Sequence, residues 1–325
     1  MRAAVYRAFG GPEVVRVEEL PKPAPKAGEV LVRVRASTVS VGDYRMRTRD
    51  LPKGLGFFGP LTIGIFAPRK KILGMDFAGI VEAVGEGAAR FKPGDEVMGL
   101  TGMKFGGHAE YVSLAETEAM VLKPEGWSFE DAVALVFGGH TVAECIRRVP
   151  IKPGDEVLVN GASGAVGTAA VQAAKHFGAV VTGVTSGGNA ELVRSLGADR
   201  VIDYTAEDFT KNGKQYDVIF ECVGNAPFER VEGSLKPGGA LLLVISDLKG
   251  MLRAGRNSRK SGKRVMAISF KPRPEHVAFE VELAEAGAMR AVIDRTYDLD
   301  QVAEAHRHVE GGRKRGNVVL RLAGA

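Results

Sequence analysis

The sequence predicts an α/β fold in which a doubly wound parallel sheet accompanies a β-rich unit. A strand, a glycine-rich turn and a helix follow one another at residues 156–178, and strands alternate with helices from there to residue 271. That alternation is typical of a parallel sheet with helices on both faces. Residues 1–122 instead show short strands separated by Gly and Pro turns, which predict a partly open β-barrel.

Composition narrows the function classes. The 45% of hydrophobic residues, 26% of charged residues and 42 glycines fit an α/β protein. A net charge of +5 favours anionic ligands such as a dinucleotide phosphate, and we expect no nucleic acid. The two cysteines, Cys145 and Cys222, can form neither a disulfide framework nor a four-cysteine zinc site. Because no stretch is long enough to span a bilayer and no apolar signal core is seen, we expect a cytoplasmic protein without a transmembrane segment.

The β-rich unit is indicated by three predicted strands. Valines recur at every second position over 30–35, as in a half-buried strand. A second strand is predicted at 77–84, and the turn at 92–95 leads into a third at 96–100.

An uncharged apolar run, residues 55–67, lies between basic flanks. It is too short to span a bilayer. A packed loop is the simpler interpretation. The alternative is an apolar lid over a hydrophobic substrate that also touches a membrane surface.

The glycine turn predicts a dinucleotide site. Gly164 lets the backbone approach a pyrophosphate, Gly167 lets the helix pack close to the strand, and free N–H groups of the first helical turn face the phosphates. Ala162 replaces the first glycine of the usual motif. A tight turn without a ligand is the alternative, and the alternating elements that follow argue against it. The predicted cofactor contacts here are Asn160, Gly161, Ala162, Ser163, Gly164, Ala165, Val166 and Gly167.

Further elements continue the alternation. We predict strands at 179–184, 200–203, 216–222, 239–245 and 263–270, with helices at 189–196, 275–287 and 299–309. Residues 248–264 carry seven basic residues and no acid, and we predict a solvated loop there. A partner surface or a nucleic-acid patch is the alternative, but no aromatic residues interleave to support the latter. The predicted domains are 1–122, completed by 272–325, and the dinucleotide-binding domain 123–271.

The end of the second dinucleotide strand predicts which nucleotide binds. NAD sites usually place Asp or Glu there to hold the ribose 2′-hydroxyl. Here the first acid after Ser186 is Glu191, already in the next helix. Ser186 and backbone N–H groups can donate to a 2′-phosphate that a carboxylate would repel, so the sequence predicts NADPH. Tyr204 and Arg194 are nearby candidates for the phosphate site, although Arg194 can equally be a solvent-facing helical charge.

Six motifs together resemble the zinc-free medium-chain dehydrogenases/reductases (MDR superfamily) of the quinone oxidoreductase type. Each is unspecific alone, but their order and spacing over nearly the whole chain are typical of the family. They read Gly74-Met-Asp-Phe-Ala-Gly79, Phe91-Lys-Pro-Gly-Asp95, Gly107-His-Ala-Glu-Tyr111, the 160–178 turn, Leu196-Gly-Ala-Asp199 with Val201-Ile-Asp-Tyr204, and Arg315-Gly-Asn-Val-Val-Leu320. The resemblance implies a GroES-like barrel domain with a Rossmann domain inserted, and a homodimer.

The resemblance also bears on the metal. Zinc-dependent relatives hold the catalytic metal with Cys, His and Cys, and the matching positions here are Ser40, Met75 and Gly138. We therefore predict no metal site. Without a Lewis acid, alkoxide chemistry is disfavoured, and an acceptor that delocalises its own developing charge is favoured.

The implied activity is zinc-independent hydride transfer from NADPH to a quinone or an α,β-unsaturated carbonyl, a small hydrophobic substrate. Tyr44, whose loop faces the nicotinamide in the family, is the predicted proton donor, with water as the alternative; Asp43 is expected to brace the loop. His140 is a weaker donor candidate. The resemblance places Thr141, Cys222, Val223, Ser246 and Asn317 at the cofactor. An NADPH-binding protein with little turnover and a partner, or an enoyl-thioester reductase, are the alternatives.

Overall fold

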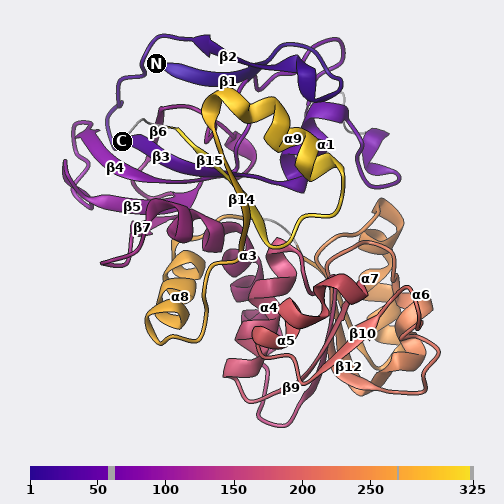
Figure 1. Ribbon diagram of the computed structural model, residues 1–325. Helices are drawn as coiled ribbons and strands as arrows, with labels where there is room; N and C mark the ends of the chain where they lie inside the picture. The colour runs from indigo at the N-terminus through magenta and orange to yellow at the C-terminus, as the bar shows by residue number, and fades with distance from the viewer. Residues whose placement is uncertain (58–62, 269–270, 323–325) are drawn as a thin grey trace.

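The structure is a computed structural model that describes residues 1–57, 63–268 and 271–322. Two large sheets lie in opposite halves of the molecule, and the long helix α3 (Phe129–Arg148) lies between them (Figure 1). The halves are a GroES-like barrel and a Rossmann-type parallel sheet, as the sequence predicts.

The barrel half is built from both ends of the chain. In spatial order its main sheet holds β14 (Ile293–Asp298), β15 (Asn317–Arg321), β3 (Glu29–Val39), β4 (Asp76–Val84), β5 (Glu96–Leu100) and β7 (Met120–Leu122), with β6 (Tyr111–Ala115) paired to β3. β1 (Arg2–Tyr6) and β2 (Val15–Glu19) form a separate hairpin. The antiparallel pairing of β15 with β3 brings the C-terminal tail back to the first half.

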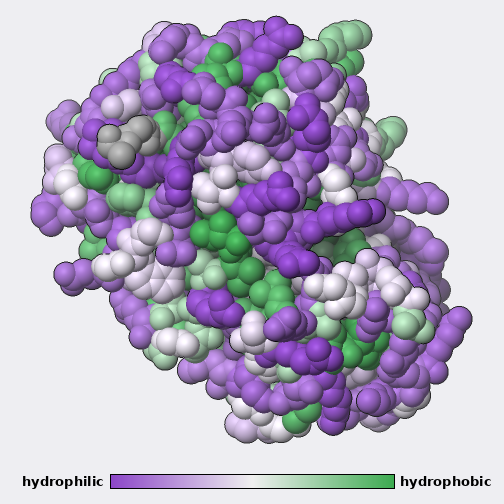
Figure 2. Space-filling view, viewed as in Figure 1, coloured by the Kyte–Doolittle hydropathy of each residue, from purple (hydrophilic) through white to green (hydrophobic). Residues whose placement is uncertain are grey.

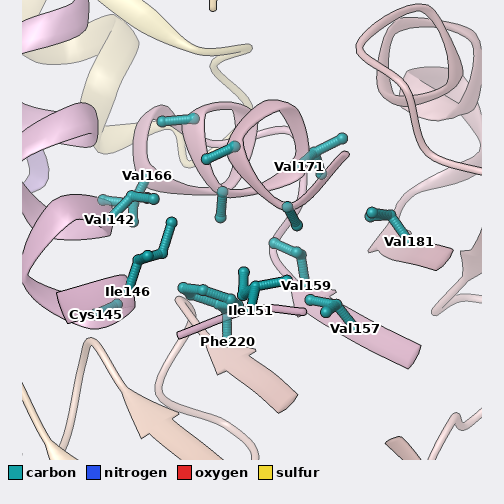
Figure 3. Close-up of a cluster of buried hydrophobic side chains, with 14 of the residues drawn as sticks. Val142, Cys145, Ile146, Ile151, Val157, Val159, Val166, Val171, Val181 and Phe220 are labelled. Carbon is teal, nitrogen blue, oxygen red and sulfur yellow. The ribbon is translucent and has the colours of Figure 1, made fainter. Parts of the chain in front are cut away.

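The Rossmann half holds six parallel strands. Their spatial order is β10 (Arg200–Asp203), β9 (Val180–Thr185), β8 (Glu156–Asn160), β11 (Tyr216–Glu221), β12 (Leu235–Leu243) and β13 (Arg264–Ala267). Val157 and Val159 point into the core under α3 and α4 (Ala165–His176), while Leu158 points into the core under α7 (Leu248–Ser261). Figure 3 shows the first of these cores. Side chains buried on both faces explain why these strands read as continuous apolar runs.

The remaining helices are α1 (Val41–Thr48), α5 (Ala190–Ser195), α6 (Phe228–Val231), α8 (Pro274–Glu285) and α9 (Val302–Glu310). α1 begins with a capping box in which the Ser40 hydroxyl accepts from the Asp43 N–H while the Asp43 carboxylate accepts from the Ser40 N–H. It ends where Arg49 turns left-handed. Asp43 therefore braces this segment, as expected.

The largest correction concerns residues 248–264. The predicted solvated loop is wrong, because the structure shows helix α7 over most of it. The Asp247 side chain caps this helix by accepting from the Gly250 N–H at 2.6 Å, and Gly262 ends it with φ of 68°. Lys and Arg are good helix formers, so an abundance of charge did not exclude a helix.

Other differences are smaller. The last dinucleotide strand ends at Ala267, and residues 269–270 of the predicted strand lie outside the described residues. In the apolar run at 55–67, residues 58–62 also lie outside them. Ile63 is buried, but Ile65 and Phe66 are exposed, so a fully packed loop is wrong for this end of the run.

Within the described residues, no helix combines the length and apolarity needed to cross a membrane. We retain 1–122 with 272–325, and 123–271, as proposed domain limits because each large sheet falls on its own side of them.

Candidate functional site

The predicted cofactor residues follow the carboxyl ends of neighbouring parallel strands. Asn160 ends β8, Ser186 follows β9, Cys222 follows β11, and Ser246 lies shortly after β12. Because parallel strands end at the same edge of a sheet, these positions meet at one edge. The molecular face in Figure 2 is hollowed between the two halves, with hydrophobic residues inside the hollow.

The glycine turn offers backbone groups to a ligand. α4 begins after Gly164 and has no side-chain cap, so its first N–H groups are available to an anion. At Gly167 a Cβ would collide with the Gly161 carbonyl and the Ala162 backbone, which explains the glycine there. Ala162 and Val166 point into the core, so these residues can meet a cofactor only through their backbone.

Asn160 holds the loop that follows β11 through two side-chain hydrogen bonds. Its amide donates to Glu221 Oε1 at 2.9 Å and to Asn225 Oδ1 at 2.8 Å. The Glu221 carboxylate also accepts from the N–H groups of Val223 and Gly224. Burial raises the pKa of Glu221 despite these donors. Asn160 thereby fixes the loop that carries Val223, and both of its amide protons are used within the protein.

The edge where β9 ends is closed by short polar contacts. The Ser163 hydroxyl accepts from Thr185 Oγ1 at 2.9 Å and from Asn189 Nδ2 at 3.2 Å. The Asn189 amide also reaches Ser186 Oγ at 3.3 Å. Arg194 and Tyr204 are both exposed beside this loop.

A carboxylate that the linear sequence did not place also reaches this edge. Pairing of β10 with β9 sets Asp203 opposite Thr185. Hydrogen bonds from the backbone and hydroxyl of Thr205 hold the pKa of Asp203 below its usual value. Asp203 was missed because strand pairing, rather than sequence distance, brings it here.

The C-terminal tail docks on the glycine turn and carries two cations, Lys314 and Arg315, that the sequence analysis did not assign to the site. The Gly316 N–H donates to the Ser163 carbonyl at 2.7 Å, which docks the tail on the turn. Arg315 Nη2 donates to the Gly188 carbonyl at 3.4 Å. Lys314 Nζ donates to the Gly316 carbonyl, and burial lowers the pKa of Lys314 to about 8. The run Arg313-Lys-Arg315 beside a glycine was the available signal.

A basic cavity adjoins this tail. Its volume is about 510 Å³. Arg295, Arg307, Arg313 and Arg315 line it, together with the Asp294–His308 pair. Arg315 thus belongs both to this cavity and to the β9 edge. The cluster makes the edge electropositive.

Tyr44 lies on α1, in the barrel half. Its hydroxyl donates to Asp50 Oδ2 at 3.0 Å. This hydrogen bond, with partial burial, raises the pKa of Tyr44. The phenol is therefore a weaker acid than free tyrosine, and its proton is held toward an exposed carboxylate.

Most of the other predicted site residues make hydrogen bonds within the protein. Thr141 Oγ1 donates to the Phe137 carbonyl at 2.9 Å, and Ser246 Oγ donates to the Asp247 carbonyl at 3.2 Å. The Asn317 amide donates to the carbonyls of Ala134 and Val292. Burial raises the pKa of Cys222 well above its usual value, so its thiol stays protonated. Val223, in contrast, is 45% exposed at the turn.

His140 is a poor proton donor. Burial, with His276 beside it, lowers the pKa of His140 to about 4, so the imidazole is neutral near pH 7. Its Nε2 accepts from the Arg273 N–H at 3.2 Å. The packing role is favoured.

The residues at the zinc positions do not fit the metal. Ser40 Oγ donates to the Asp43 carboxylate at 2.6 Å, Met75 is buried, and Gly138 has no side chain. A Cβ at Gly138 would meet the Ala165 carbonyl. Over residues 1–57, 63–268 and 271–322, no group of three or more His, Cys, Asp or Glu is arranged to hold a metal ion.

Comparison with known proteins follows this geometry. Residues 26–125 match the alcohol dehydrogenase GroES-like domain, and residues 196–320 match a family described as zinc-binding dehydrogenase. A quinone oxidoreductase from Pseudomonas aeruginosa is 31% identical, with 97% of this chain and 98% of that protein covered. A 2-methylene-furan-3-one reductase from Solanum lycopersicum is also 31% identical, with 98% and 79% covered. The structure of Escherichia coli quinone oxidoreductase complexed with NADPH has a TM-score of 0.82 and 25% identity, with 99% and 100% covered.

Proposed function

We propose that this chain, which belongs to the quinone-oxidoreductase-like family of medium-chain dehydrogenases/reductases, is a zinc-independent NADPH-dependent reductase of hydrophobic quinones or enones. It is an oxidoreductase, and its cofactor is a nicotinamide dinucleotide. One observation carries the choice of NADPH: an arginine from the tail closes the β9 edge.

The proposed cofactor site has two anion-binding parts. The uncapped N-terminus of α4 receives the pyrophosphate, with Lys314 adding positive charge nearby. Ser186 and Arg315 receive the 2′-phosphate. Thr205 donates twice to Oδ1 of Asp203, which leaves Oδ2 able to accept from a ribose hydroxyl, so the preference for a 2′-phosphate depends on Arg315.

Bound NADPH supplies a hydride from its nicotinamide ring. The chain contributes no Lewis acid at Ser40, Met75 or Gly138, so the acceptor must spread the developing negative charge by its own conjugation. Exposed Val41, beside Ser40, and Val223, at the glycine turn, supply apolar contacts for such an acceptor. These features favour a quinone or enone over a simple ketone.

Tyr44 is the proposed proton donor. Its hydroxyl already carries a positioned proton, and exposed Asp50 can exchange protons with solvent. The raised pKa keeps Tyr44 protonated through the neutral range, as a donor requires.

A homodimer is also proposed. β13 is an edge strand of the six-stranded sheet, with neighbours on one side only among the described residues. An unpaired edge is a ready site for strand pairing with a second copy.

The test is NADPH oxidation, followed by absorbance, against a benzoquinone, a naphthoquinone, a 2-alkenal, a long-chain enone and a simple ketone. Turnover with the conjugated acceptors, unchanged by a chelator, is expected. Turnover with the ketone alone, or activity lost to the chelator, would contradict the proposal. Tight NADPH binding without turnover of any acceptor would favour the binding-protein alternative.

A further inference from the structure

Four hydrophobic side chains project from the surface on two segments far apart in sequence. Phe66 is 94% exposed and Ile65 57%, while Leu252 and Met251 on α7 are 75% and 40% exposed. We call these four residues the apolar rim. Scattered exposed aliphatics are ordinary, but a nearly fully exposed phenylalanine and leucine on adjoining segments call for a partner.

Backbone and side-chain contacts connect the two segments. The Leu248 N–H, at the start of α7, donates to the Lys53 carbonyl at 3.1 Å. Leu248 also packs so closely that a Cβ at Gly54 would lie 2.9 Å from its own Cβ. On the other side of this segment, Arg49 Nη1 donates to the Ile65 carbonyl at 3.1 Å. In Figure 1, α1 and α7 accordingly lie on the same side of the molecule, one on each half. The rim therefore spans both halves.

Cations surround the rim on α7. Leu252 shares the outward face with Lys249, Arg256 and Arg259, at spacings of three, four and seven residues, opposite the buried Ala254. Arg253 and Lys260 flank that face, and helix α7 contains no acid. Arg253 does lie 3.9 Å from Glu229, a long and exposed ion pair.

The other segment repeats the pattern. Arg69, Lys70 and Lys71 follow Phe66 closely, and all three are exposed. Arg49 and Lys53 are exposed on the connecting stretch. Asp50 is the acid on this stretch, and it is engaged by Tyr44.

Charge and apolarity together identify the partner. A solvated basic face would not need Phe66 and Leu252 outside. A nucleic acid would be bound by cations with several stacking aromatics, whereas Phe66 is one aromatic among three aliphatic side chains in the rim. Apolar tips ringed by Lys and Arg match a bilayer surface, where anionic headgroups lie above the acyl boundary. The site does not depend on residues outside the described ranges.

We propose that the apolar rim and its cations bind the surface of an anionic lipid bilayer. Docking there brings the chain to the membrane, where hydrophobic quinones dissolve, so that the bilayer can supply its substrate. This second statement rests on the proposed function, whereas membrane binding itself does not.

The test is co-sedimentation of the full chain with vesicles of phosphatidylcholine alone or mixed with phosphatidylglycerol, at low and high salt. Binding to the mixed vesicles, weakened by salt, is expected. The double variant F66S/L252S and the charge variant K249Q/R253Q/R256Q should each weaken it by about 10-fold. Glutamine is a good helix former and keeps α7 intact.

Matched controls lie away from the rim, one on β7 of the barrel sheet and one at the amino ends of the Rossmann strands. Leu122→Ser removes a side chain that is 57% exposed, and K152Q/K211Q/K214Q removes three cations near the amino ends of β8 and β11. Both controls should bind vesicles as the parent chain does. No vesicle binding by the parent, equal binding by all variants, or preferential binding to an RNA oligonucleotide would overturn the proposal.

Turnover assays distinguish membrane binding from the proposed reductase activity. Rim variants should reduce a water-soluble benzoquinone normally and lose activity only toward a long-chain quinone supplied in mixed vesicles. If the chain binds vesicles but reduces no quinone, the proposed function fails and the membrane surface stands.

Discussion

The Rossmann half and the barrel half of the proposed site differ in which groups they offer: backbone groups in the first and side chains in the second. On the Rossmann wall, side chains such as Asn160 and Ser163 are hydrogen-bonded within the protein, and the backbone of the uncapped α4 N-terminus is left for the proposed cofactor. On the barrel wall, α1 presents Tyr44 as a side chain, and buried ionisable groups lie behind it. Arg47, His108 and His306 all lie in that interior with no exposed surface. One wall should therefore be sensitive to steric change, and the other to protonation.

The largest expected effect is steric. In Gly167→Ala the new Cβ meets the Gly161 carbonyl, so the turn must move. We expect loss of NADPH binding and a fall of about 1–3 kcal/mol in the free energy of unfolding. Fluorescence titration and urea denaturation measure both. The control is Gly233→Ala, where nothing lies within 4 Å of the added atom. An alanine at 167 that binds NADPH normally would remove the steric account of this wall.

The barrel wall should respond to a single hydroxyl. Tyr44→Phe removes the proposed donor and should lower kcat about 100-fold, the low end of general acid catalysis. The dissociation constant for NADPH should not change, since the phenol does not hold the cofactor in this proposal. Asp50→Asn should lower kcat less than Tyr44→Phe does and shift the pH profile of turnover, because the carboxylate exchanges the proton of Tyr44 and helps set its pKa. Unchanged kcat in Tyr44→Phe would exclude this tyrosine and leave water as the donor.

Arg315 is the exception that sharpens the comparison, because a side chain completes the Rossmann wall. Arg315→Ala should raise the dissociation constant for NADPH about 10-fold, a loss of about 1.4 kcal/mol. The constant for NADH should stay the same. Arg313→Ala is the matched control, since Arg313 lines the same cavity, whereas Arg315 is the residue that donates to the Gly188 carbonyl at the β9 edge. Equal losses for both nucleotides would assign Arg315 to the fold or the pyrophosphate instead.

The smallest effect concerns pH. Burial, with His108 and Arg47 nearby, holds the pKa of His306 well below its usual range. The unfolded chain therefore takes up this proton first as the pH falls below about 6.5, and the folded state loses up to about 1.4 kcal/mol per pH unit. His306→Leu should flatten this acid limb in urea denaturation at several pH values.

Asp76 acts in the opposite direction. Burial raises its pKa to about 7, so its contribution to stability is lost as the pH rises from about 4 to 7. Because Asp76 is present in both proteins, the difference between the parent and His306→Leu isolates the histidine. Identical slopes would show that His306 is protonated in the fold.

The sequence predicted features that neighbouring residues determine, and it missed those that distant parts of the chain form together. β10 was predicted with its observed limits, 200–203, because a short apolar run determines it locally. The family resemblance selected residues, Cys222 and Ser246 among them, that follow strand ends at the edge proposed here for the cofactor. Asp203 and Arg315 could not be placed, because strand pairing and tail docking bring them in from a distance. Helix α7 was missed because the prediction rested on the charge of residues 248–264 and did not use the helix caps, Asp247 and Gly262.

The most direct test of the central claim compares kcat/KM for NADPH and NADH with a benzoquinone in the presence of a chelator. A zinc-independent site with a cation at the 2′-phosphate predicts full activity with chelator and a preference for NADPH of about 10-fold or more. Equal rates with both nucleotides, a preference for NADH, or activity abolished by the chelator would contradict it.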